Sequence, residues 1–185
     1  MGILRAGGIM AEKKIDKSRR NFLFGAVRRL KNEDADQPVA ATASAIDVMK
    51  EANGLYVDEQ WEEARLKYKD CLKEDQNDAD IRYRLGVCSY RVGKYRQAKL
   101  EFERCLRIDQ KYSDAFLYLG LTMVRLDRPE KAPALWSRYF NPGAVKIQRE
   151  LNLQLGLLES GQKDPVEVIA QAVEKAIAES GGAVG

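Results

Sequence analysis

Residues 79–112 read ADIRYRLGVCSYRVGKYRQAKLEFERCLRIDQKY, and the same pattern precedes and follows this stretch at a spacing of 34 residues. Small, aromatic and apolar residues recur at that interval in four equivalent sets: Ala52, Gly86 and Gly120; Ala64, Ala98 and Ala132; Tyr68, Phe102 and Trp136; Leu72, Leu106 and Phe140. A fixed period of this length is typical of stacked supersecondary units, each of which buries its apolar stripe only against its neighbours. Residues 45–146 are therefore predicted to form a repeat protein.

The spacing within one copy indicates how its helices pack. Phe102 follows Ala98 by four residues, so both side chains lie on the same face of one helix. A small residue on the other helix, such as Gly86, lets the next helix approach closely, and the aromatic ring fills the space beside it. We expect these positions to lie in the core of every copy.

Residues 79–112 resemble the tetratricopeptide repeat (TPR), a helix–turn–helix unit of 34 residues. The residues that carry the resemblance are Leu85, Gly86, Gly93, Tyr95, Ala98, Phe102, Cys105 and Leu106, then Leu119, Gly120, Pro129, Ala132 and Trp136 in residues 113–146, and Ala52, Trp61, Ala64, Tyr68 and Cys71 in residues 45–78. The resemblance implies an all-α fold: a right-handed helical-repeat solenoid of three TPR-like helix pairs.

The third copy departs from this pattern at two positions. Pro133 falls just inside its second helix, where proline is tolerated only in the first turn. Tyr139 replaces the small residue that is Cys71 and Cys105 in the other copies. We therefore expect the third copy to pack against its successor less regularly.

The segments outside the repeats divide by composition. We expect residues 1–9 to be an appendage before a natural start at Met10, and residues 1–17 to be a flexible basic N-terminus. Residues 32–44 are polar and rich in Pro and Ala, which predicts a linker with Ser44 as N-cap of the first repeat helix. Residues 147–180 are predicted to be a degenerate capping helix pair with a more polar outer face, in which Asp164 caps the last helix and Pro165 is its first residue. Residues 181–185 are expected to be loose.

Charge and composition exclude several classes of function. The net charge is +3, but residues 11–31 alone carry a net charge of +6, so the repeats are mildly acidic and do not predict nucleic-acid binding. No run of 18 apolar residues could span a membrane as a helix. The sequence has no histidine, no Gly-rich phosphate loop and no close pair among Cys71, Cys88 and Cys105. We predict buried structural thiols, no metal, no cofactor and no catalytic residues, in a reducing compartment.

The TPR resemblance implies that the first helix of each copy lines a concave, partner-binding groove. The candidate partner-binding residues are Asn53, Tyr83, Arg84, Tyr90, Arg91, Tyr118 and Arg125, with Met49, Lys50, Tyr56, Val87, Leu117, Leu121 and Val124 also on this face. Tyrosine and arginine are typical of binding hot spots and favour an extended segment that bears carboxylates and an apolar anchor. The alternative is that the tyrosines only pack between helices and the arginines are solvated.

Chaperone-binding members of the family hold a C-terminal carboxylate with a clamp of Lys, Asn and Arg residues. Only Asn53 matches that clamp, and the other corresponding sites hold Met49, Arg84, Asp114 and Tyr118. A chaperone C-terminus is therefore not the expected ligand.

The stretch SRRNFL at residues 18–23 resembles the twin-arginine export motif, but Arg28 and Arg29 interrupt the apolar run that a signal peptide needs. The same stretch is also predicted to form a basic amphipathic helix over residues 18–31, which would dock on an anionic membrane surface or in a partner's groove. A third interpretation is that it covers the end of the repeat stack. The candidate docking or targeting residues are Arg19, Arg20, Phe22, Leu23, Val27 and Leu30.

Together these features predict a non-enzymatic TPR adaptor or scaffold that binds a partner protein in its groove. We expect it in the cytoplasm or at the inner membrane surface, in the assembly of a bacterial multiprotein complex. The alternative is an exported or membrane-surface-associated scaffold that the twin-arginine-like segment directs.

Overall fold

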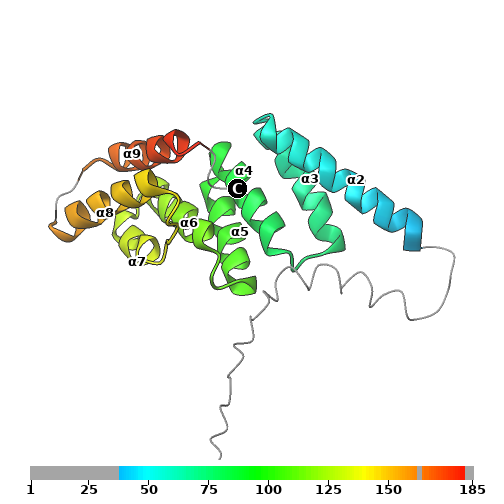
Figure 1. Cartoon of the computed structure of the whole chain (residues 1–185), viewed down its shortest axis with the longest axis horizontal. Coiled ribbons are helices and arrows are strands. Elements are labelled where there is room, and N and C mark those ends of the chain that lie inside the picture. Colours follow the sequence, from blue (N-terminus) through cyan, green and yellow to red (C-terminus); the bar gives the residue numbers. More distant parts are fainter. Residues whose placement is uncertain (1–37, 162–163, 182–185) are drawn as a thin grey trace, which may run out of the picture. The chain divides into compact units, whose positions relative to one another are not determined.

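The computed structural model describes residues 38–161 and 164–181, and every regular element in these ranges is helical (Figure 1). The elements are α2 (Pro38–Val57), α3 (Trp61–Glu74), α4 (Ala79–Arg91), α5 (Tyr95–Ile108), α6 (Ser113–Arg125), the 3-10 helix η2 (Pro129–Lys131), α7 (Ala132–Trp136), α8 (Val145–Glu159) and α9 (Val166–Glu179). The chain divides into two compact units, Met1–Ala41 and Thr42–Gly185, and the helical stack belongs to the second. The predictions for residues 1–17, for the twin-arginine-like segment 18–31 and for 182–185 lie outside the described residues.

Neighbouring helices pack against one another in chain order: α3 on α4, α4 on α5, α5 on α6, and α6 on α7. Two apolar clusters form the core. The smaller one joins α2, α3 and α4 around Ala52, Tyr68 and Leu85. The larger one runs from α4 to α9 and contains Phe102 and Trp136. The prediction of an all-helical fold with packed neighbouring helices is confirmed for the described residues.

The small and aromatic positions of the 34-residue period meet in space. A Cβ added at Gly86 would lie 2.5 Å from Cε1 of Phe102, and one at Gly120 would overlap the indole of Trp136. The alanines that precede these rings in α5 and α7 are fully buried, as is Tyr68 in α3. The fourth set is not equivalent, because Leu72 is buried whereas Phe140 is 73% exposed.

The second helix of the third copy is short and irregular. It consists of η2 and the five-residue α7, whereas α3 and α5 each have 14 residues. Pro133 lies in the first turn of α7, where proline is tolerated. Tyr139 lies beyond the helix and is buried. The sequence had identified both departures but had not predicted how early this helix ends.

The first helix begins earlier than the sequence predicted. α2 starts at Pro38, so residues 38–44 are helical, not part of a linker, and Ser44 is not the N-cap. Alanine has the highest helix propensity, and proline suits the first helical position, so the Pro/Ala composition that indicated a linker is compatible with a helix start.

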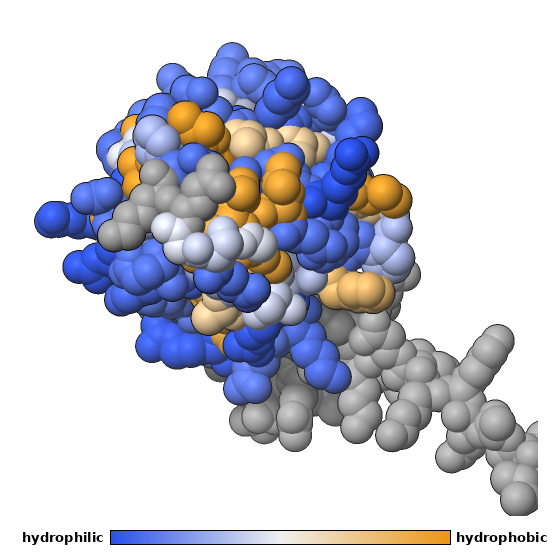
Figure 2. Space-filling view, turned by 90° about the vertical axis from the view of Figure 1, so that its left-hand side faces the viewer, coloured by the Kyte–Doolittle hydropathy of each residue, from blue (hydrophilic) through white to orange (hydrophobic). Residues whose placement is uncertain are grey.

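The last two helices form the predicted pair but differ from it in two details. α9 begins at Val166 with Pro165 in the N-cap position, one residue later than predicted. The outer face of the pair is not distinctly polar, since Val145 and Leu153 are 69% and 54% exposed. Figure 2 shows apolar side chains gathered on the side of the stack that α7–α9 form. The polar outer face had been predicted because a terminal repeat must be soluble, and these two exposed apolar residues depart from that expectation.

Candidate functional site

The tyrosines predicted to line the groove lie in the core. Tyr83, Tyr90 and Tyr118 are all buried, and their rings pack on one another and on Phe102 with centroid distances of 5.8 to 6.1 Å. They therefore pack between helices, which is the alternative that the sequence left open, and do not contribute an open binding surface. The sequence could not distinguish the two roles because tyrosine combines an apolar ring with a polar end.

Arg125 is engaged within the chain and is not an open groove residue. Its Nη1 donates to Glu167 at 2.6 Å, and its Nη2 donates to both carboxylate oxygens of Glu174 at 2.9 Å. Tyr90 donates its hydroxyl proton to the same Glu174 carboxylate. Burial and this hydrogen bond raise the pKa of Tyr90, so the hydroxyl is a donor at neutral pH. Both glutamates belong to α9, which the sequence had assigned to an outer cap.

Helix α9 covers the predicted groove at its C-terminal half. It packs on α6 as well as on α8, and Figure 1 shows it beside both helices. Three predicted lining residues of α6, Leu117, Leu121 and Val124, are buried in the same apolar cluster as Ile169 and Val173 of α9. No local sequence signal places α9 there, because the arrangement depends on contacts between residues about 50 positions apart.

The open part of the predicted groove lies over α2 and α4. Arg84 is partly exposed and lies over the ring of Tyr56, with its Cζ 5.3 Å from the ring centroid. Arg91 is exposed and lies 5.5 Å from the centroid of Trp61. Asn53 accepts a hydrogen bond of 2.7 Å from the Tyr68 hydroxyl. The structure thus brings three of the predicted residues, Asn53, Arg84 and Arg91, into one region together with two aromatic rings.

The two arginines of this region are suited to bind carboxylates. Among the described residues neither Arg84 nor Arg91 forms an ion pair. Arg84 also interacts with the hydroxyl of Tyr68, and Arg91 with that of Tyr118. The remaining N–H groups of each guanidinium can still donate to a carboxylate, which they match in geometry. We name the surface formed by Asn53, Tyr56, Trp61, Arg84 and Arg91 the arginine–aromatic surface. Trp61 was noted in the sequence only as a repeat position, not as a binding residue.

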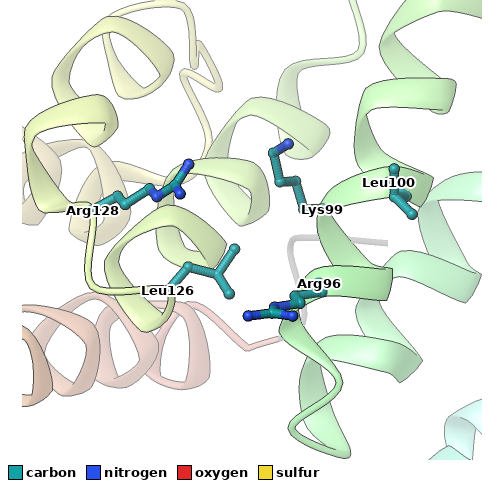
Figure 3. Close-up of a pocket in the computed structure, with 5 residues that line it drawn as sticks. All are labelled: Arg96, Lys99, Leu100, Leu126 and Arg128. Atoms are coloured by element: carbon teal, nitrogen blue, oxygen red, sulfur yellow. The ribbon is translucent and has the colours of Figure 1, made fainter.

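A shallow pocket of about 340 Å³ lies between α5 and the turn after α6 (Figure 3). Arg96, Lys99 and Leu100 of α5 line it together with Leu126 and Arg128. Lys99 pairs with Glu103 at 3.2 Å, whereas Arg96 and Arg128 form no ion pair within the described part of the chain. This pocket was not predicted from the sequence, because its residues come from two copies and share no periodic position.

The three cysteines are buried and unpaired, as predicted. Burial raises the pKa of Cys88 and of Cys105 to about 12, so both are thiols at neutral pH and poor nucleophiles. Within the described ranges, no three His, Cys, Asp or Glu side chains are grouped so that they could hold a metal ion. No helix in these ranges has the length and apolar character needed to cross a membrane.

No family model matches the chain, and no curated protein matches its sequence.

Proposed function

We propose that the chain is a TPR-like helical-repeat scaffold that binds a segment of a partner protein and has no chemistry of its own. The observation that carries this proposal is the recurrence of one contact at the 34-residue period: Gly86 against Phe102, and Gly120 against Trp136. A tight glycine–aromatic contact between the two helices of a pair is what a stack of identical units requires. We also propose that the stack is a right-handed solenoid and that the protein takes part in the assembly of a bacterial multiprotein complex.

The partner segment binds on the arginine–aromatic surface, over α2 and α4. Arg84 and Arg91 supply positive charge without an internal carboxylate partner, and Tyr56 and Trp61 supply apolar area beside them. This combination favours an extended segment that carries acidic residues and an apolar anchor. The remaining length of the predicted groove, over α6, is covered by α9.

The double substitution Arg84→Glu/Arg91→Glu should lower the affinity for the partner about tenfold or more, because two charge-assisted hydrogen bonds are replaced by repulsion. Tagged full-length chain would first be used to capture partners from native membranes and cytosol, with quantitative mass spectrometry. The captured protein would then be purified and its affinity measured by calorimetry. Circular dichroism should show an unchanged helix content, since Arg91 is exposed and Arg84 is partly exposed.

The matched control is Arg96→Glu/Arg128→Glu, which makes the same change of charge in the pocket beside α5. This variant should bind the partner as the wild type does. Equal capture by wild type and Arg84→Glu/Arg91→Glu would remove the arginine–aromatic surface from the proposal. Loss of binding only in the control variant would show that the partner binds at the pocket beside α5 and not at the arginine–aromatic surface.

A second candidate function follows from the stretch SRRNFL at residues 18–23: a scaffold that is exported or held at a membrane surface. Deletion of residues 10–31 should abolish membrane co-sedimentation if this segment docks on anionic lipid. Arg19→Lys/Arg20→Lys keeps the charge and alters the twin-arginine pair, so it should abolish export but not electrostatic docking. Membrane association that survives the deletion would reject docking through this segment.

A further inference from the structure

We propose that α9 is a built-in ligand of the groove, and that the surface over α4 and α6 recognises an acidic amphipathic helix of a partner, which displaces α9. This inference rests on the proposed function, because it extends the binding groove from the arginine–aromatic surface to α6. The part of the groove over α6 is proposed to bind a different ligand from the arginine–aromatic surface, namely a helix with one central carboxylate.

Most of the polar contacts that α9 makes with α4 and α6 involve one residue, Glu174. Both oxygens of its carboxylate accept hydrogen bonds from Nη2 of Arg125, and one of them also accepts a bond of 3.3 Å from Nε of the same arginine. The hydroxyl group of Tyr90 donates to this carboxylate as well. Arg125 is on α6 and Tyr90 on α4, so one carboxylate joins α9 to the first helices of two copies. A bidentate arginine–carboxylate pair fixes the register of the bound helix as well as holding it. Glu167, seven residues or about two turns before Glu174 and on the same face of α9, adds a second and more exposed ion pair with Arg125.

The apolar contacts of α9 follow one helical stripe. Ile169, Val173 and Ile177 are spaced by four residues, lie on one face of the helix and are buried in the cluster that includes the apolar residues of α6. The opposite side carries exposed residues such as Gln171 and Lys175. A helix that places an apolar stripe in a groove and one acidic residue against an arginine is a recurrent mode of peptide recognition.

Release of α9 would leave the repeat stack intact. α9 makes its main helix contacts with α6 and α8, whereas α4 and α6 are also held by α3, α5 and α7. The ion pair is only partly buried, since the side chains of Arg125 and Glu174 are 16% and 26% exposed. Water and a competing carboxylate can therefore reach it, and local opening of such an element requires less free energy than global unfolding.

The test uses the full chain and a labelled peptide of residues 164–181, DPVEVIAQAVEKAIAESG, in fluorescence anisotropy. Glu174→Lys in the chain reverses the charge of its own α9 and leaves Arg125 and Tyr90 unchanged. The peptide should bind this variant at least about tenfold more tightly than the wild type, whose groove is filled. Glu174→Gln removes only the charge and should give an intermediate affinity. The control Lys175→Glu alters the next residue, which is 78% exposed, and should bind the peptide as weakly as the wild type does.

Hydrogen exchange on the same proteins provides a second readout that needs no peptide. Amides of α9 should exchange faster in Glu174→Lys than in the wild type, while those of α4 to α6 should not change. The proposal is overturned if α9 exchanges at the wild-type rate, if it exchanges faster but the opened groove takes no peptide, or if wild type and Lys175→Glu bind as tightly as Glu174→Lys. None of these measurements involves Arg84 or Arg91. A groove that takes the peptide while capture is insensitive to Arg84→Glu/Arg91→Glu would reject the proposed partner surface and leave this inference standing.

Discussion

Replacing Gly120 by alanine should lower the free energy of unfolding by about 3 kcal/mol, since a new methyl group would overlap the indole of Trp136. The indole is fully buried, and its Nε1 donates to the carbonyl of Leu117 at 3.2 Å, so it cannot turn aside without losing that bond. Gly86→Ala should behave in the same way against Phe102. Urea unfolding followed by circular dichroism would measure both.

Two other helical glycines serve as matched controls. Nothing lies within 4 Å of a Cβ added at Gly54 in α2 or at Gly156 in α8. Alanine at these positions should stabilise the protein by about 0.5–1 kcal/mol, because glycine is the poorer helix former. Combining Gly120→Ala with Trp136→Phe should cost about 1 kcal/mol less than the two single changes added together, since the smaller ring leaves room. A Gly120→Ala protein as stable as Gly156→Ala would show that the close helix approach is not required.

The helix pairs could be predicted from the sequence because they depend on short-range spacing. Ala98 and Phe102 lie on one face of α5 because they are four residues apart, independently of the rest of the chain. Gly86 lies in α4, and the short turn between α4 and α5 brings it against this face. A 34-residue period then repeats the same local solution. Where the pattern changed, at Pro133 and Tyr139, the sequence indicated irregularity but not its form.

The groove could not be predicted in the same way. The burial of Tyr83, Tyr90 and Tyr118 depends on which residues pack over them: Tyr83 packs on Tyr112 and Tyr118, whereas Tyr90 contacts Glu174 of α9. The apolar residues and glutamates that hold α9 in place lie outside the three repeats. Glutamate on an amphipathic helix is ordinarily solvated, so its sequence context gave no reason to pair it with Arg125. Asn53, Arg84 and Arg91 were assigned to the groove by the TPR resemblance, and in the structure they are partly or fully exposed.

Asp114→Asn should raise the free energy of unfolding at pH 7 by about 2 kcal/mol, which is an unusual direction for a change in a half-buried polar side chain. Asp114 lies in the first turn of α6, and its Oδ1 is buried without a hydrogen-bond partner among the described residues. Burial raises its pKa from 3.8 to about 6. The ionised carboxylate is therefore disfavoured in the folded protein, and an uncharged amide of the same shape removes that cost.

The pH dependence follows from the sign of this shift. The folded state holds the Asp114 proton more tightly than the unfolded state, so the contribution of this group to stability is complete below pH 4 and is lost as the pH rises to about 6. Urea unfolding between pH 4 and pH 8 should show this decline in the wild type and not in Asp114→Asn. Asp58→Asn, in the exposed turn after α2, is the control and should leave the stability within about 0.5 kcal/mol of the wild type. A decline that persists in Asp114→Asn would assign it to another group. Tyr83, on α4, also has a buried hydroxyl group without a hydrogen-bond partner among the described residues. A stabilising Asp114→Asn would show that a buried polar group at the start of α6 opposes folding, as polar groups do at binding sites.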